Sequence, residues 1–479
     1  MDVKLAEADK FLTYQDCYDY LFEKIFPLRP ADYGSKYPKW PGLVGIEVEM
    51  LPLYTASLNK STPDTVPLYE GGKSLVDMLY SMQSGRSDWR FVDVPEGSKH
   101  LMNVLLEDED QLSFEPGGQL EFSSKPYPCL SDALARTRAM QATVDEAAKA
   151  HGITILQVGM NPWRSVDEIG LQMNKPRYQA MDSFFARQGV HGQRMMRQTC
   201  TIQLNLDFGG CEDTLAKRYI VGNLIAPFAT ATFANSPFLD GKLNGLLSNR
   251  GDTWQHMDPT RTGFPNLDDV IKLRTRKACV EAYLDWIMKG RVIFSERHAF
   301  EVMDGTFNFG DWVEKGYKGL KPTLKDLQTH LSLQFPEVRA RGFLELRSVD
   351  AQHRYWQAAP GAYYTGIIYD DKSLDDTLEL LLPEFPRLTE LWQKAPTGLQ
   401  DKDIARLSKR VVEIAIEGFS RMPPCYHGGE ATHILTDFYH RYTEKSLTPA
   451  DEIVRKFKAQ GKFTGQDLID LENDWKKTV

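Results

Sequence analysis

Two glutamates in the segment 113–124, SFEPGGQLEFSS, stand where carboxylates could hold a cation. Around Glu121 polar and apolar residues alternate, which is the period-two pattern of a β-strand. Glu121 therefore falls on the polar face of this strand, and a Pro-Gly-Gly bend separates it from Glu115. Carboxylate oxygens are ligands that Mg²⁺ prefers. The segment is a candidate for one part of a metal site.

Three other segments show the same alternation with an equally polar face. In GLVGIEVEM, Glu47 and Glu49 alternate with apolar residues. The polar positions of TCTIQLNLDF and VRARGFLELR are Thr199, Thr201, Gln203, Asn205 and Asp207, then Arg339, Arg341, Glu345 and Arg347. One such strand taken alone is usually amphipathic, with its polar face in water. Together, however, the four faces carry Glu, Gln, Asn and Arg and hardly a lysine, which favours a shared site.

Glutamates placed side by side on one sheet repel each other unless a cation lies between them. We therefore interpret the four polar faces as one oxygen-rich site for Mg²⁺. Arginines would lie at its rim, where the planar guanidinium suits phosphate or carboxylate. Such a site favours phosphoryl transfer from a metal-bound nucleotide. Because the sequence has neither a P-loop motif nor a GxSxG nucleophile motif, ATP is expected to bind through the sheet and its metal ions.

The composition excludes several other classes of protein. The 479 residues carry a net charge of −9 with scattered basic residues, so a nucleic-acid partner is not expected. No run of about 18 apolar residues predicts a membrane span, and the N-terminal residues do not resemble a signal peptide. We expect a cytoplasmic protein, as a monomer or homodimer. The six cysteines lack short paired spacings, which favours mostly reduced thiols and leaves one regulatory pair open.

The remaining chain must position these strands. Strands separated by long helical segments predict an α+β fold on one mainly antiparallel sheet. We expect one domain over residues 1–479, with a helical C-terminal part at about 371–479, and irregular segments at 55–74 and 242–265. The predicted strands are 42–51, 101–107, 118–124, 153–159, 198–208 and 337–349. The predicted helices are 7–26, 130–150, 177–188, 212–233, 267–289, 323–334, 353–368, 401–419 and 465–475.

Nine motifs in consecutive order resemble the glutamate–cysteine ligases of the plant and proteobacterial type. They are GIEVEM, FEPGGQLEFSS, GMNPW, KPRYQAM, MMRQTCTIQLNLDF, FANSPFLDGKLNG, DPTRTGF, HLSLQFPEVRARGFLELRSVDAQ and GIIYD, within about residues 40–370. The resemblance implies that family's glutamine-synthetase-like fold, a curved cradle of antiparallel strands with helices outside. It also implies an enzyme that uses ATP and Mg²⁺ to phosphorylate the γ-carboxylate of L-glutamate. The amine of L-cysteine then attacks, which is the first step of glutathione biosynthesis.

The resemblance also implies roles for individual residues. The expected metal-site residues are Glu47, Glu49, Glu115, Glu121, Gln203 and Glu345. Arg347 is expected to face the transferring phosphoryl group, and Arg341 to bind phosphate or the α-carboxylate of glutamate. For both arginines, a structural ion pair with Glu345 or Asp350 is the alternative. The candidate substrate contacts are Arg177, Thr199 and Asn205, although a core hydrogen bond explains the last two almost as well.

Four other functions fit parts of the pattern. A related carboxylate–amine ligase would join glutamate to a different amine, and a glutamate–cysteine ligase could feed another thiol pathway. A glycosidase would use Glu115 and Glu121 as acid and base, but this leaves the arginine strand unexplained. A non-catalytic protein on the same scaffold is expected to have lost some of the carboxylates, and all of them are present here.

Overall fold

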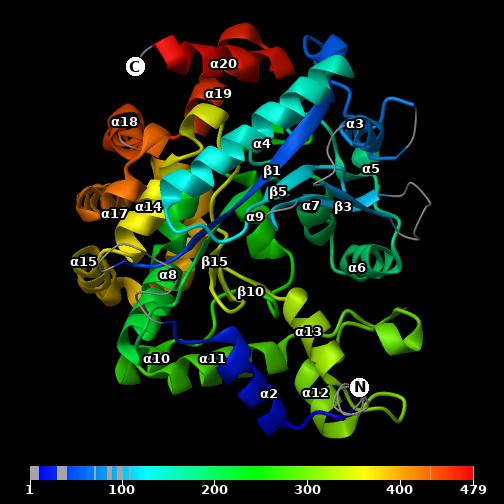
Figure 1. The fold of residues 1–479 in the computed structure, drawn as a ribbon, viewed down its shortest axis with the longest axis vertical. Coiled ribbons are helices and arrows are strands. Elements are labelled where there is room, and N and C mark those ends of the chain that lie inside the picture. The colour runs from blue at the N-terminus through cyan, green and yellow to red at the C-terminus, as the bar shows by residue number, and fades with distance from the viewer. Residues whose placement is uncertain are drawn as a thin grey trace.

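The computed structural model describes residues 10–29, 40–69, 72–83, 89–93, 101–106, 109–431 and 433–477. A nine-stranded antiparallel sheet forms its centre (Figure 1). The strand order is β14-β15-β7-β1-β5-β4-β3-β2, and β6 pairs with the later part of β1. The strands are β1 (Val44–Tyr54), β2 (Arg90–Asp93), β3 (Leu101–Leu105), β4 (Gln111–Phe114), β5 (Leu120–Ser123), β6 (Ile153–Leu156), β7 (Ile202–Leu206), β14 (Val338–Ala340) and β15 (Leu344–Leu346). The predicted α+β class with a mainly antiparallel sheet is confirmed.

Helices cover the apolar face of this sheet. On β1 the side chains of Val44, Ile46, Val48 and Met50 are buried, as the alternation predicts. Helix α4 (Leu130–Ala150) packs against β1, α8 (Glu212–Thr232) against β14 and β15, and α14 (Ala359–Ile368) against β7 (Figure 1). The polar residues of the same strands are thereby left on the opposite face.

Most of the predicted helices are present. Helices α4 and α8 match the predicted ranges 130–150 and 212–233 within one residue. The other matches are α2 (Tyr14–Tyr20) with the π-helix η1 (Leu21–Ile25), α6 (Pro176–Ala186), α13 (Leu324–Ser332), α14, α17 (Lys402–Arg421) and α20 (Gly465–Lys477). Residues 7–9 of the first predicted helix and residue 107 of a predicted strand lie outside the described residues.

Three predictions are wrong in part, each for a local reason. The predicted helix 267–289 is two helices, α10 (Asp268–Leu273) and α11 (Arg276–Lys289), because Arg274 adopts a left-handed conformation at φ 50°. The predicted strand 337–349 is the β14–β15 hairpin, which turns at Gly342 with φ 84°, a conformation that glycine adopts without strain. The segment 242–265, expected to be irregular, contains helix α9 (Asn249–His256), whose first turn is capped by the hydroxyl of Ser248.

Smaller elements complete the fold. The chain beyond residue 371 is mainly helical, as expected, and α20 lies at the opposite end of the molecule from α11 and α12 (Figure 1). The remaining α-helices are α3 (Leu75–Ser81), α5 (Val166–Ile169), α7 (His191–Arg197), α12 (Phe309–Lys315), α15 (Asp371–Leu381), α16 (Leu388–Lys394), α18 (Ile434–Arg441) and α19 (Pro449–Gln460). The short strand pairs are β8 (Phe238–Leu239) with β9 (Lys242–Leu243), β10 (Thr262–Gly263) with β13 (Phe335–Pro336), and β11 (Phe294–Ser295) with β12 (Glu301–Val302). Among the described residues, no helix combines the length and apolar character needed to span a membrane.

One disulfide joins distant parts of the chain. Cys129, the N-cap of α4, is bonded to Cys425, which follows α17. The other four cysteines, Cys17, Cys200, Cys211 and Cys279, are free thiols. The sequence left one cysteine pair open, and the structure identifies which pair it is.

Reduction of this disulfide is expected to lower the free energy of unfolding by about 2–5 kcal/mol, because the bond closes a long loop in the unfolded chain. The sequence separation of the two cysteines is 296 residues. The measurement is urea denaturation with and without reductant, compared with Cys425→Ser. Cys211→Ser, at an exposed free thiol, is the matched control. Reduction should lower its free energy of unfolding by the same amount as in the parent protein. An unchanged denaturation midpoint on reduction would contradict this prediction.

Candidate active site

The register of the strands brings the predicted polar residues to one patch of the sheet. The directly opposed pairs are Glu49 with Glu121, Glu47 with Gln203, and Asn205 with Glu345. Directly opposed side chains have Cβ atoms about 5 Å apart. A continuous row of oxygen-bearing side chains therefore crosses β5, β1, β7 and β15.

The β4–β5 hairpin brings Glu115 to the same patch. The Gly118 N–H donates to the Glu115 carbonyl at 2.9 Å, and Gly118 has a φ of 88°, so the turn requires the left-handed conformation that glycine tolerates. Gly117 lies against the backbone of Arg197 at the end of α7, where a Cβ atom would collide. Gly118 is thus required by the turn conformation, and Gly117 by the close approach of the Arg197 backbone. Together the two glycines fix the position of Glu115.

Glu49, Glu115 and Glu121 form a compact carboxylate trio. One oxygen of each lies within 4.8 Å of the others. The hydroxyls of Ser113 and Ser123 donate to Glu121 Oε1 at 2.9 and 2.7 Å. Burial, together with the charge of Glu121, raises the pKa of Glu49 to about 8. Burial and both neighbouring carboxylates raise the pKa of Glu115 well above its usual range. The trio therefore favours neutralisation, by protons or by a cation.

Glu47 and two amides extend the trio towards β7. Burial and the charges of Glu345 and Glu121 raise the pKa of Glu47 to about 7. The Asn205 amide nitrogen donates to Glu47 Oε1 at 2.9 Å. The amide oxygens of Gln203 and Asn205 are buried without a hydrogen-bond partner. Unpaired buried oxygens beside carboxylates of raised pKa are the donor set that suits Mg²⁺, so the residues fit this ion.

Glu345 lies in a different electrostatic environment from the trio. Its buried carboxylate accepts hydrogen bonds from Arg339 at 2.9 and 2.7 Å, from Arg341 at 3.0 Å, and from Arg347. Burial alone would raise the pKa of Glu345, but the three guanidinium groups outweigh it and hold the pKa well below its usual range. Glu345 is thus the counter-ion of three arginines, and its expected role as a metal ligand stays a prediction.

The expected catalytic arginines differ in how firmly they are held. Arg347 is buried, and its guanidinium lies 4.9 Å from the ring centroid of Trp254 and 5.7 Å from that of Phe335. Arg341 has a side chain that is 48% exposed, with one hydrogen bond to Glu345. Arg347 is therefore fixed in direction, whereas Arg341 keeps donors available for a ligand.

Arg250 was missed by the sequence analysis. It lies in the first turn of α9 and donates to the Arg347 carbonyl at 2.8 Å. Its positive charge acts on Glu49, where it opposes the rise of the pKa. No pattern in the segment SNRGDTW marks Arg250, because its position depends on the tertiary packing of α9, which contacts α7.

The three candidate substrate contacts have different surroundings. Asn205 faces the carboxylates, as described above. The Thr199 hydroxyl donates to the Met195 carbonyl at 2.7 Å, which is a core hydrogen bond. Arg177 donates to the Ser332 hydroxyl at 2.9 Å. Next to it on α6, burial and the charge of Glu115 raise the pKa of Tyr178 to about 12.

Mg²⁺ is expected to raise the melting temperature more at pH 8 than at pH 6. In the folded protein the pKa values of Glu47 and Glu49 are about 7 and 8, above their ordinary value. These groups therefore make the metal-free protein less stable as pH rises from about 4.5 towards 8. A bound cation would offset this loss of stability. The stabilisation by the cation is larger at pH 8, where more of the carboxylates are ionised.

The measurement is a thermal unfolding series at both pH values, with and without the same free Mg²⁺ concentration. Glu281→Gln, at an exposed ion pair with Lys277 on α11, is the control and should keep the pH dependence of the Mg²⁺ effect. Equal shifts at pH 6 and pH 8 in the unmodified protein would contradict the prediction.

Comparison with known proteins agrees with this geometry. Residues 43–467 match the family model of glutamate-cysteine ligase family 2. The chain is 33% identical over 408 residues to the chloroplastic glutamate–cysteine ligase of Arabidopsis thaliana, covering 82% of this chain and 71% of that protein. It is 32% identical over 425 residues to the chloroplastic glutamate–cysteine ligase of Medicago truncatula, covering 86% and 77%.

A solved structure shares the fold. A bifunctional glutathione synthetase from Pasteurella multocida superposes with a TM-score of 0.50 at 14% identity. The match covers 97% of this chain and 54% of that chain, so this protein spans about half of the bifunctional one. At this identity the likeness bears on the fold alone. The family match covers nearly all of the chain and includes every strand of the carboxylate patch, so this ligase belongs to glutamate–cysteine ligase family 2.

Proposed function

We propose that this protein catalyses the ATP- and Mg²⁺-dependent ligation of the L-glutamate γ-carboxylate to the amine of L-cysteine, the first step of glutathione biosynthesis. The observation that carries the proposal is the pairing of two clusters on one sheet face. One is the carboxylate trio, in which the raised pKa values of Glu49 and Glu115 favour a cation. The other is the group of three arginines around Glu345, which suits an anion. A phosphoryl transfer between two anions needs both.

The metal site would be formed by Glu49, Glu115 and Glu121, with Glu47 and the unpaired amide oxygen of Gln203 beside them. When bound, Mg²⁺ would neutralise negative charge on the ATP phosphates and on the glutamate carboxylate. The two serine hydroxyls on Glu121 and the backbone N–H of Thr201 on Glu49 orient these carboxylates before any ligand arrives.

The arginines would act on the transferred group. A γ-carboxylate oxygen of glutamate attacks the γ-phosphorus of ATP, and ADP leaves with the electrons of the broken P–O bond. Arg347, fixed by Glu345, Trp254 and Phe335, stabilises the charge that spreads over the phosphoryl oxygens. Arg341 binds a phosphate or the α-carboxylate of glutamate. The amine of cysteine then attacks the γ-carbonyl carbon, and phosphate leaves with one oxygen of the original carboxylate.

The test is ADP release from Mg²⁺-ATP with glutamate and a panel of amines. The panel contains cysteine, its methyl analogue 2-aminobutyrate, alanine, serine and ammonia. The proposal predicts that ADP formation requires glutamate and is fastest with cysteine. ADP formed only with another amine would replace the acceptor named here. No ADP with any amine would contradict the ligase reaction itself.

A further inference from the structure

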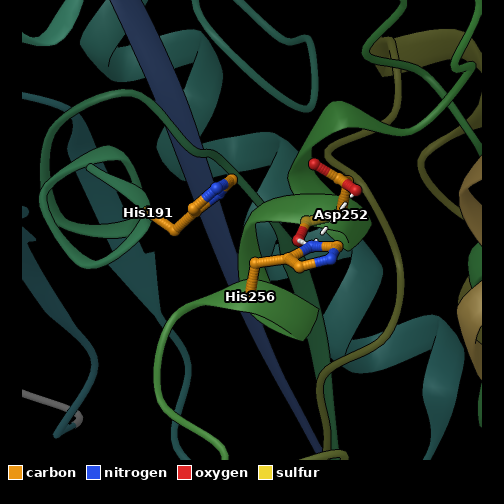
Figure 2. A group of neighbouring side chains, drawn as sticks. All are labelled: His191, Asp252 and His256. Atoms are coloured by element: carbon orange, nitrogen blue, oxygen red, sulfur yellow. Dashed lines mark hydrogen bonds and ion pairs between the residues drawn. The ribbon is translucent and has the colours of Figure 1, made fainter. Parts of the chain in front are cut away.

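A second group of metal-ligating side chains lies outside the carboxylate patch. His191 at the start of α7 and Asp252 and His256 on α9 come together although they are up to 65 positions apart in the sequence (Figure 2). A ligand atom of each lies within 4.8 Å of the others. The spacing of the histidines in the sequence predicts no zinc site and indicates no role for these residues.

Asp252 and His256 lie on one face of α9. They are four residues apart, which places them one helical turn from each other. His256 Nδ1 lies 2.9 Å from the Asp252 carbonyl oxygen and 3.2 Å from Asp252 Oδ1. Because a carbonyl can only accept, Nδ1 carries the proton of neutral His256. The lone pair of Nε2 is left free to bind a metal.

His191 supplies an independent observation. Its Nδ1 is buried and has no hydrogen-bond partner, and a buried polar atom without a partner carries a cost that needs an explanation. The His191 ring points towards Asp252 and His256 (Figure 2), and the centroids of the two imidazole rings are 5.3 Å apart. The nearest cation on α7, Arg194, is paired with Asp240 at 2.6 Å, so its charge is partly offset.

An ordinary surface pair explains only part of this arrangement. His440 and Glu444 have the same four-residue spacing, with Nδ1 and a carboxylate oxygen 3.2 Å apart. That pair belongs to no three-residue metal-ligating group among the described residues. The His440–Glu444 pair therefore shows that a histidine and an acid at this spacing form the same contact outside any metal-ligating group that the described residues form. The His440–Glu444 contact does not explain why His191 Nδ1 is buried without a hydrogen-bond partner.

We propose that His191, Asp252 and His256 bind one Zn²⁺ ion, with water completing the coordination. Two imidazoles and a carboxylate are a common ligand set for zinc, whereas Mg²⁺ prefers the oxygen cluster. A tetrahedral zinc with bonds of about 2.1 Å places its ligands roughly 3.4 Å apart. Because His256 Nδ1 lies beside Asp252 Oδ1, the exposed side chain of His256 would have to rotate on metal binding to bring Nε2 to the shared ion.

The ion would link α7 to α9 beside the active site. Helix α7 leads into β7, which carries Gln203 and Asn205, and the first turn of α9 carries Arg250. Zinc binding would therefore hold together two elements that position the carboxylate patch. The role inferred is structural and is separate from the proposed ligation.

The experiment is calorimetric titration of the zinc-free protein with Zn²⁺ in a Cys211→Ser background, which removes the exposed thiol. Millimolar Mg²⁺ is present throughout to occupy the carboxylate patch. One zinc is expected per chain. His191→Gln and His256→Gln should each weaken binding by at least about tenfold, since loss of even an outer partner costs 10- to 100-fold. His440→Gln is the matched control and should bind zinc unchanged.

A second readout is the visible spectrum after loading with Co²⁺, which reports tetrahedral coordination. The spectrum of the control should match that of the parent and be lost in both other variants. Circular dichroism checks that each variant is folded. Undiminished zinc affinity in folded His191→Gln would overturn the proposal, as would a parent protein that binds no zinc under these conditions.

Discussion

Glu49→Gln is expected to lower turnover by about 100-fold or more while the protein stays folded. Glu49 is buried at the centre of the carboxylate trio, opposite Glu121 and within reach of the charge of Arg347. The amide keeps the shape and removes the negative charge that a divalent cation needs. Losses of this size are typical when a preorganised charged group at a reacting centre is removed. The measurement is the steady-state rate of ADP formation as a function of Mg²⁺ concentration.

The same substitution is expected to raise the melting temperature of the metal-free protein at pH 8. The pKa of Glu49, about 8 in the folded protein, shows that folding disfavours its charge, so a neutral side chain removes a cost. Glu281→Gln on α11 is the control for both readouts. Near-normal turnover, or a lower melting temperature with lost turnover, would contradict the role assigned to Glu49.

Glu345→Gln is expected to lower the free energy of unfolding by about 3–5 kcal/mol, even without metal. The substitution leaves Arg339, Arg341 and Arg347 around a neutral side chain, and breaking a buried ion pair from one side carries a cost of this size. The carboxylate of Glu345 is fully buried and bonded to all three arginines. The measurement is urea denaturation of the metal-free protein at pH 7.

The two glutamine variants therefore have stability effects of opposite sign. Glu49 lies among carboxylates, so its negative charge destabilises the metal-free protein. The negative charge of Glu345, in contrast, stabilises a cluster of three arginines. If Glu345 acted mainly as a metal ligand, Glu345→Gln would leave the metal-free protein as stable as the parent, or more so. That result would contradict the counter-ion role.

Alternation in the sequence was sufficient to predict the polar face of the sheet. Glu47, Glu49, Glu121, Gln203 and Asn205 all lie on the predicted side, because a side chain's face in a strand depends only on parity. Pairing across strands is set by register, which parity does not contain. The shared composition of the four polar faces predicted one site, and the register that sets Glu49 directly opposite Glu121 was found only in the structure.

The surroundings of Glu345 could not be predicted in the same way. The sequence places three arginines near it on one face, but a hairpin at Gly342 decides that Arg339 lies directly opposite Glu345. Arg250 and His191 were missed because α9 and α7 come beside the sheet through tertiary packing, with no local pattern to indicate it. The single-domain organisation, the oligomeric state and the cytoplasmic location stay predictions.

The transfer of a glutamate oxygen to phosphate tests the proposed phosphoryl transfer most directly. L-Glutamate labelled with oxygen-18 in its γ-carboxylate is incubated with Mg²⁺-ATP and cysteine, and the released phosphate is examined by mass spectrometry. In the proposed reaction a γ-carboxylate oxygen attacks the γ-phosphorus of ATP. One labelled oxygen is therefore expected in each phosphate released. Phosphate without the label, formed together with the γ-glutamyl product, would contradict phosphoryl transfer to glutamate on this sheet.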